Sequence, residues 1–188
     1  MEKIFLPDPQ DNNFTLLNAI KKRKSIREYK DEPLELQEIS NLLYSASKIP
    51  SAGALYPLRF YLYSKKVNGL ELGLYFYDYE NHLLIKIFNT NIINQLTRAC
   101  LNQSSIRKSA AIIIITSINR ITTRRYDERG IRYIHMEAGH SSQNIYLMAT
   151  SLNIGTVAIG AFYDEEVKEI LKLEEDEFPL YLMPLGKI

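Results

Sequence analysis

Residues 131–153 read IRYIHMEAGHSSQNIYLMATSLN, and their apolar positions decide how the rest of the chain can fold. Apolar side chains recur every three or four residues, which predicts one long helix interrupted only by Gly139. One face of this helix carries Ile134, Ala138, Ile145, Ala149 and Leu152, and further apolar residues spread elsewhere, namely Met136, Tyr146, Leu147 and Met148. A helix that is apolar over so much of its circumference is expected to be deeply buried or to lie at a subunit interface.

Strand-like segments stand on both sides of this helix in the sequence and predict a sheet. The run SAAIIIITSI at 109–118 is continuous and β-branched, which is typical of a strand covered on both faces. The stretch GLYFYDYENHLLIKI at 73–87 predicts two strands joined by a turn near 79–81. Further strands are expected at 58–66, 156–162 and 178–185. A hairpin among interspersed helices indicates an α+β fold with a mixed or mostly antiparallel sheet.

Shorter helices are expected from Phe14 into a basic cluster, after Glu32-Pro33, and over 90–101. The second of these has Ile39, Leu42, Leu43 and Ala46 on one face. Asp164 is expected to cap another short helix, with Glu165 and Glu166 in the first turn, where the helix dipole favours acidic residues. The polar, proline-bearing residues 1–13 predict an N-terminal arm, and 14–188 are predicted to form a single domain because no linker or repeat divides them.

The composition describes a globular chain without a strong overall field. Of the 188 residues, 46% are apolar and 24% charged, and the net charge of +1 gives no steering to nucleic acid or a membrane. The single cysteine, Cys100, excludes an internal disulfide and a thiolate metal cluster. No apolar run approaches the roughly 20 residues of a membrane span, and the N-terminus lacks the features of a secretory signal. A soluble, cytoplasmic protein is therefore expected.

Several common functional motifs are missing. No glycines form G-x-G-x-x-G, and Ala161 stands where a phosphate loop ending on Gly160 would need a lysine. His135 and His140 lie about 140° apart on a helix, so they do not share an ion easily. Glu137 and His140 form a single E-x-x-H unit, for which packing is a better interpretation than metal binding. We predict no metal site, and we interpret Cys100 as a buried structural residue.

The segment KKRKSIR at 21–27 concentrates positive charge in an otherwise neutral chain. Five of its seven residues are cationic. Three interpretations compete: a solvated helix end, a patch for nucleic acid or lipid, and a phosphate site. In an extended segment Arg23, Ser25 and Arg27 point to one side, so two guanidinium groups and one hydroxyl can converge on a small anion.

This segment is followed by PSAGALYP at 50–57 and RRYDERGIRYIHMEAGHSSQNIYLMATSLNIGTVAIGAF at 124–162. In this order and spacing the motifs resemble the nitroreductase-like flavin oxidoreductase family, and within it the SagB-type branch, which includes thiazoline oxidases. The resemblance covers about residues 19–187. It implies a nitroreductase-like three-layer fold, with a central, mostly antiparallel sheet flanked by helices, in an interlocked homodimer. FMN would bind non-covalently between the two protomers.

The resemblance also assigns the site residues. Arg23, Ser25 and Arg27 would take the phosphate and ribityl end, and Lys187 remains as a further basic residue for the phosphate. Pro50, Ser51, Ala52 and Gly53 would approach the flavin of the other subunit, with Leu55 close by. Asn102 or Gln103 would reach the ring edge, and the backbone of Ile159, Gly160 and Ala161 would lie by the ring. Small residues at these positions let backbone come close to a planar ligand.

The activity implied is two-electron hydride transfer through the flavin, on a small-molecule or peptidic substrate. NAD(P)H or the substrate itself would be the electron donor. Azoline-oxidising relatives carry a Lys-Tyr pair where this chain has Arg125-Tyr126. Arginine stays protonated, so Tyr126 is the candidate catalytic residue, and azoline-to-azole oxidation on a modified peptide is the alternative. A non-catalytic flavin-binding protein and a basic-patch binding module are the other function classes.

Overall fold

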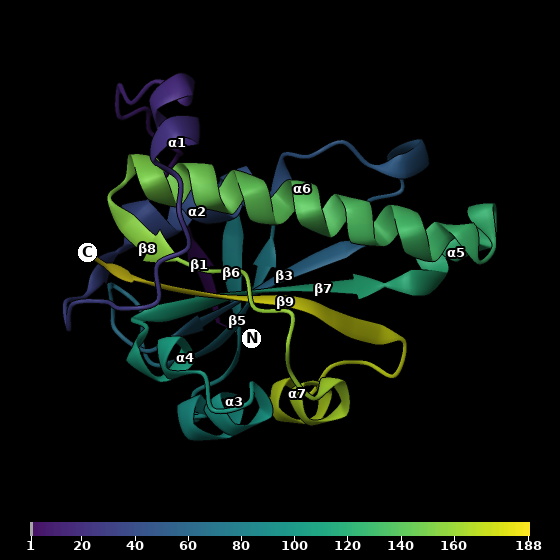
Figure 1. Ribbon diagram of the computed structural model, residues 1–188. Coiled ribbons are helices and arrows are strands. Elements are labelled where there is room, and N and C mark those ends of the chain that lie inside the picture. Colours follow the sequence, from purple (N-terminus) through teal and green to yellow (C-terminus); the bar gives the residue numbers. More distant parts are fainter. Residues whose placement is uncertain (1) are drawn as a thin grey trace.

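The computed structural model describes residues 2–188, which form three layers. A twisted sheet occupies the middle, with helices α1, α2 and α6 on one face and α3, α4 and α7 on the other (Figure 1). The helices are α1 (Leu16–Lys22), α2 (Leu36–Ser47), α3 (Ile93–Ala99), α4 (Ser104–Lys108), α5 (Asn119–Tyr126), α6 (Arg129–Ser151) and α7 (Asp164–Leu171). The predicted α+β fold is confirmed. None of the helices in residues 2–188 is long and apolar enough to cross a membrane.

Seven strands form the main sheet in the order β1-β6-β5-β3-β7-β9-β8, and every neighbouring pair is antiparallel. These strands are β1 (Lys3–Phe5), β3 (Leu58–Ser64), β5 (Gly73–Asp78), β6 (Leu83–Phe88), β7 (Ala111–Ile118), β8 (Ile154–Thr156) and β9 (Glu177–Lys187). Two short strands, β2 (Leu34–Glu35) and β4 (Val67–Asn68), pair separately in parallel. The expected hairpin at 73–87 is confirmed as β5 and β6.

Strand β7 lies between the two helix layers and packs against both of them. All eight of its residues are buried, as its continuous apolar run predicts. Because side chains alternate along a strand, Ile113 and Ile115 enter the core beneath α2 and α6, while Ile112 and Ile114 enter the core beneath α3 and α7. Each helix layer therefore packs on its own face of one shared strand.

The long helix is confirmed as α6, which runs across the sheet and packs against α2 and β8. Ile134, Ala138, Ile145 and Ala149 are buried as expected, whereas Met136 is 53% exposed. The hydroxyl of Ser141 donates to the Ala46 carbonyl of α2 at 2.8 Å. This contact fixes one side of α6 against α2.

Three local expectations differ from the structure. Of the strand expected over 156–162, only Thr156 lies in a strand, β8. Beyond it, Ile159 alone pairs with β9, through an isolated bridge to Leu182. Part of the expected N-terminal arm forms the edge strand β1, which pairs with β6, while Met1 lies outside the described residues. Asp164 occupies the first turn of α7, and Tyr163 is the N-cap.

The basic segment after α1 is extended and fixed to the sheet edge. The Ile26 N–H donates to the Thr156 carbonyl and the Lys30 N–H to the Lys187 carbonyl, both at 2.9 Å. The ring of Tyr29 lies on Gly186, where a β-carbon would come within 2.5 Å of Tyr29 Cβ. The missing side chain at this position lets the segment lie flat on β9.

We predict that Gly186→Ala destabilises the protein by about 1–3 kcal/mol, because the new methyl group overlaps Tyr29 in a segment already tied by backbone hydrogen bonds. Thermal unfolding followed by circular dichroism measures the change. Gly139→Ala in α6 is the matched control, since its β-carbon meets nothing within 4 Å among the described residues. It should raise the stability by about 0.5–1 kcal/mol. Equal melting temperatures for the two variants would contradict the tight contact at Gly186.

Candidate functional site

The hydroxyl of Tyr146 joins three segments that are distant in the sequence. It accepts a hydrogen bond from the Ala158 N–H at 2.8 Å, and it lies 2.9 Å from Ser25 Oγ. The guanidinium carbon of Arg23 lies 5.2 Å from the centre of the Tyr146 ring, a cation–π distance. Helix α6, the basic segment and the chain after β8 are therefore fixed to one another at a single side chain.

The basic segment keeps its positive charge available. Within residues 2–188, none of the five cations between Lys21 and Arg27 has a carboxylate within ion-pair distance. The neighbouring Glu28 is instead paired with Lys108 at 2.5 Å. Unpaired guanidinium groups beside a hydroxyl favour a phosphate or carboxylate group as ligand.

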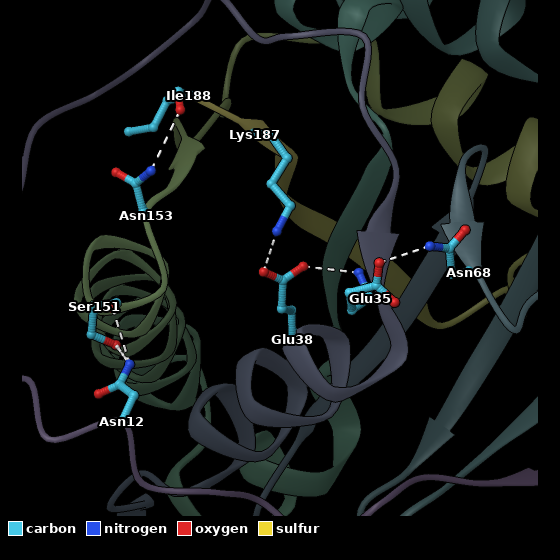
Figure 2. A network of polar contacts seen from close by, with 8 residues as sticks. All are labelled: Asn12, Glu35, Glu38, Asn68, Ser151, Asn153, Lys187 and Ile188. Carbon is cyan, nitrogen blue, oxygen red and sulfur yellow. Dashed lines mark hydrogen bonds and ion pairs between the residues drawn. The ribbon is translucent and has the colours of Figure 1, made fainter.

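Lys187 lies differently from what the sequence suggests for a phosphate ligand. Its ammonium group pairs with the Glu38 carboxylate at the start of α2 (Figure 2). The other oxygen of Glu38 accepts the backbone N–H of Glu35 at 2.8 Å, which completes the helix cap. The positive charge of Lys187 is therefore neutralised by the carboxylate of Glu38.

The chain after β8 lines a slot beside the N-terminal half of α6. Gly160 and Ala161 are exposed, and their backbone N–H groups donate to no other described residue. A cavity of about 310 Å³ is lined there by His135, Ala138, Gly160, Phe162, Asp164, Pro179, Leu180 and Tyr181. The lining mixes small, aromatic and polar residues, and the free N–H groups of Gly160 and Ala161 could donate hydrogen bonds to a flat ring placed there.

The loop between α3 and α4 adds a polar side chain to this slot. Gln103 Nε2 donates to the Ala161 carbonyl at 3.2 Å, so the two predicted segments meet in the structure. Asn102 precedes it in a left-handed conformation with a φ of 60°, and its side chain is exposed. Of the side chains of Asn102 and Gln103, only that of Gln103 forms a hydrogen bond to the segment at Ala161 among the described residues.

The remaining predicted residues form a second group. We call residues 51–56, SAGALY, the SAGALY loop; Pro50 enters it, and Leu55 lies within it. The Ala52 N–H donates to the buried Glu137 carboxylate at 2.9 Å. A β-carbon on Gly53 would lie 2.8 Å from both Tyr126 Oη and Arg125 Nη1. The structure therefore brings Tyr126 to the SAGALY loop of its own chain.

The two groups lie on opposite sides of α6. Tyr146 follows Glu137 by nine residues, which corresponds to about 13.5 Å along the axis and about 180° around it. The SAGALY loop lies near α5 and the start of α6, whereas α1 and β8 lie near the end of α6 (Figure 1). Among residues 2–188, no hydrogen bond or ion pair links residues 50–55 to the basic segment or to residues 156–161.

Other chemistries find little support. In the described part of the chain, no three His, Cys, Asp or Glu residues gather to hold a metal ion. Burial raises the pKa of Cys100 to about 12, so its thiolate is not formed near neutral pH. The interpretation of Cys100 as a buried residue is confirmed.

Two residues of the site were not identified from the sequence. In the sequence, Tyr146 belongs to the apolar residues that spread around the helix, and Glu137 is half of a single E-x-x-H unit. The signal for Glu137 was a carboxylate on an otherwise apolar helix face, since such groups are seldom buried without a partner. Tyr146 gave no comparable signal, because its partner Ser25 is 121 residues away.

Comparison with known proteins gives a consistent picture. The sequence model of the nitroreductase family matches residues 20–187. A protein of Methanocaldococcus jannaschii described as a nitroreductase is 44% identical, covering 98% of this chain and 96% of that protein. A nitroreductase-like crystal structure from Anabaena variabilis superposes with a TM-score of 0.90 at 31% identity. It covers 99% of this chain, which in turn spans 41% of that longer chain. The NADPH:FMN oxidoreductase of Vibrio harveyi, complexed with NAD⁺, has the same fold at 19% identity, with a TM-score of 0.70 over 92% of this chain and 68% of its own.

We predict that Tyr146→Phe lowers the melting temperature by about 2–4 °C, because the Ala158 N–H loses its acceptor while the ring packing stays. Differential scanning calorimetry measures the shift. Tyr163→Phe is the control, since Tyr163 is 56% exposed and its hydroxyl has no hydrogen bond to another described residue. A melting temperature for Tyr146→Phe equal to that of the control would show that the hydroxyl does not fix the three segments.

Proposed function

Because the chain belongs to the nitroreductase family and is on that ground an oxidoreductase, we propose that it is an FMN-dependent enzyme of the SagB-type branch. In this proposal the flavin lies between two copies of the chain and carries a hydride from one substrate to another. The single cysteine leaves the chain without the internal disulfides common in secreted proteins, so the cytoplasm is the proposed compartment.

The observation that carries the proposal is the division of the site into two groups on opposite sides of α6. The cationic segment and the slot at Gly160 belong to one side, and the SAGALY loop belongs to the other. One copy therefore offers a half-site for the phosphate and one face of the ring, together with a loop that points elsewhere. Two copies related by a two-fold axis would complete two equal sites.

Each residue in the first half-site has a defined task. Arg23 and Arg27 would bind the phosphate, and Ser25, held by Tyr146, would bind at the ribityl end. The phosphate depends on these two arginines, since Lys187 is neutralised by Glu38. The N–H groups of Gly160 and Ala161 would face the ring, with Asn102 or Gln103 at its edge. When bound, FMN supplies the two-electron redox chemistry.

Exposed apolar side chains support a second copy as the partner. Leu16, Leu17 and Ile20 on α1 are each more than half exposed, and so is Met136 on α6. On α1, Ile20 follows Leu16 and Leu17 by four and three residues, so the three share one helix face, which favours a contact with another protein. The expectation that α6 lies at a subunit interface agrees with this distribution.

NAD(P)H is the proposed electron donor, in keeping with the Vibrio harveyi relative. Its nicotinamide would pack transiently on the ring, so no dinucleotide fingerprint is needed. The substrate class stays open between small molecules and peptides. Azoline oxidation is the second candidate, favoured by the motifs shared with that branch, while Arg125 in place of lysine counts against it.

We predict that Arg27→Ala weakens FMN binding by about 10- to 100-fold, because one charge-assisted contact to the phosphate is lost. Fluorescence titration of the apoprotein with FMN measures the affinity. Lys24→Ala is the matched control: it removes the same charge from the same segment, on the side that alternation turns away from Arg27. Equal affinities for the two variants would contradict a specific phosphate site.

We further predict that anaerobic mixing of the FMN-loaded protein with NADH or NADPH bleaches the visible absorbance of the flavin, and that admitting oxygen or a nitroaromatic acceptor restores it. Stopped-flow absorbance measures both half-reactions. Bleaching only with an azoline-containing peptide would instead favour the second candidate. A protein that binds FMN yet is reduced by neither donor nor peptide would be a non-catalytic flavin-binding protein.

A further inference from the structure

The SAGALY loop has a conformation that would not persist on its own. Gly53, Ala54 and Tyr56 have φ values of 61°, 55° and 49°, in the left-handed region. Glycine tolerates this region, but alanine and tyrosine bring their β-carbon too close to the backbone. Such a conformation is kept only where surrounding groups hold it.

Two side chains from neighbouring helices hold the loop. Glu137 of α6 accepts the Ala52 N–H at 2.9 Å, and Arg125 Nη1 of α5 donates toward the Gly53 carbonyl at 3.4 Å. Within the loop, the Tyr56 N–H donates to Ser51 Oγ at 2.8 Å. We call Glu137 and Arg125 the loop clamp.

The packing around Gly53 shows why the clamp needs glycine there. Arg125 and Tyr126 both come within 2.8 Å of the place that a β-carbon would take. The Arg125 guanidinium lies 5.5 Å from the centre of the Tyr126 ring, and that ring packs edge-on against Tyr133 at 5.1 Å. The end of α5 is thus fixed in turn by α6.

Burying the Glu137 carboxylate costs folding free energy. It is only 3% exposed, and its second oxygen, Oε2, has no hydrogen-bond partner among the described residues. For stability alone, an apolar residue of similar volume would serve as well or better than a buried carboxylate with one donor. The residue therefore makes sense as a means of fixing the Ala52 N–H in one place.

We propose that Glu137 and Arg125 are positioning residues, which hold the SAGALY loop in the shape that completes the flavin site of a second copy. This inference rests on the proposed function. It gives Arg125 a task other than the proton transfer assigned to the lysine in azoline-oxidising relatives. A guanidinium keeps its charge and its planar set of N–H donors, so it can hold a hydrogen bond to a carbonyl in a fixed geometry.

The experiment compares Glu137→Ala with Glu137→Gln in the full-length protein. Glutamine keeps an oxygen that can accept the Ala52 N–H, whereas alanine removes it. Hydrogen exchange of the peptide covering residues 51–56, measured by mass spectrometry without FMN, should be about tenfold or more faster in Glu137→Ala and close to wild type in Glu137→Gln. FMN affinity should fall about tenfold or more in the alanine variant and recover in the glutamine variant.

Ser141→Ala is the matched control. Ser141 is buried on the same helix, and its hydroxyl donates to the Ala46 carbonyl, away from the loop. Its loss should lower the melting temperature without changing exchange in the loop. If Glu137→Ala does not fold, Arg125→Ala tests the clamp at an exposed position, with faster exchange in the same peptide expected. Arg125→Lys should lie between Arg125→Ala and wild type in both exchange and FMN affinity.

The outcomes separate the inference from the function on which it rests. Unchanged exchange in the folded Glu137 and Arg125 alanine variants overturns the clamp. Faster exchange with unchanged FMN affinity overturns the role of the loop in the flavin site. A wild-type protein that binds no FMN overturns the proposed function, while the exchange data still decide whether the clamp exists.

Discussion

Helix α6 imposes the constraint on which the rest of the structure depends. It crosses the sheet as one continuous element, and it carries a tyrosine hydroxyl toward the edge strand β8 and a buried carboxylate toward the loop after α2. A rigid helix keeps these two groups about 13.5 Å apart along its axis and on opposite sides. Among residues 2–188, no hydrogen bond or ion pair links the two groups within one chain. In the proposed function, each chain would contribute one group to each of two equal sites in a symmetric pair.

The sheet edge explains how a nearly neutral chain presents a cationic site. Strands β8 and β9 each supply one backbone acceptor for the segment after α1, and Gly186 of β9 gives the ring of Tyr29 room to lie flat on the sheet. The segment is thereby held extended, and alternation turns Lys24 to the side opposite Arg23 and Arg27. The Glu38 carboxylate binds Lys187 and completes its own helix cap (Figure 2). The Glu28 carboxylate pairs with Lys108. Positive charge stays unpaired because the local carboxylates already have partners.

Periodic segments could be predicted from the sequence, and segments shaped by distant contacts could not. The all-apolar run of β7 and the helical repeat of α6 carry their own signal, so their type and approximate bounds followed directly. Strand β1 exists because β6 offers it an edge, and β8 stops at Thr156 because the chain turns away toward Tyr146 and Gly160. In the site, the alternation at Arg23, Ser25 and Arg27 and the small residues at Gly53 and Gly160 were visible as patterns. The ion pair of Lys187 with Glu38 was not, since it joins residues 149 positions apart.

The exchange of lysine for arginine at position 125 connects the fold to the chemistry. A lysine beside Tyr126 could lose its proton when desolvated, and it could then share in proton transfer. A guanidinium cannot do so, and here it lies against the Gly53 carbonyl and near the Tyr126 ring instead. Within this cluster Arg125 keeps its charge at any ordinary pH, and the Tyr126 hydroxyl is the candidate proton donor or acceptor. In this proposal Arg125 would hold the Gly53 carbonyl in either protonation state of Tyr126, while Glu137 holds the Ala52 N–H.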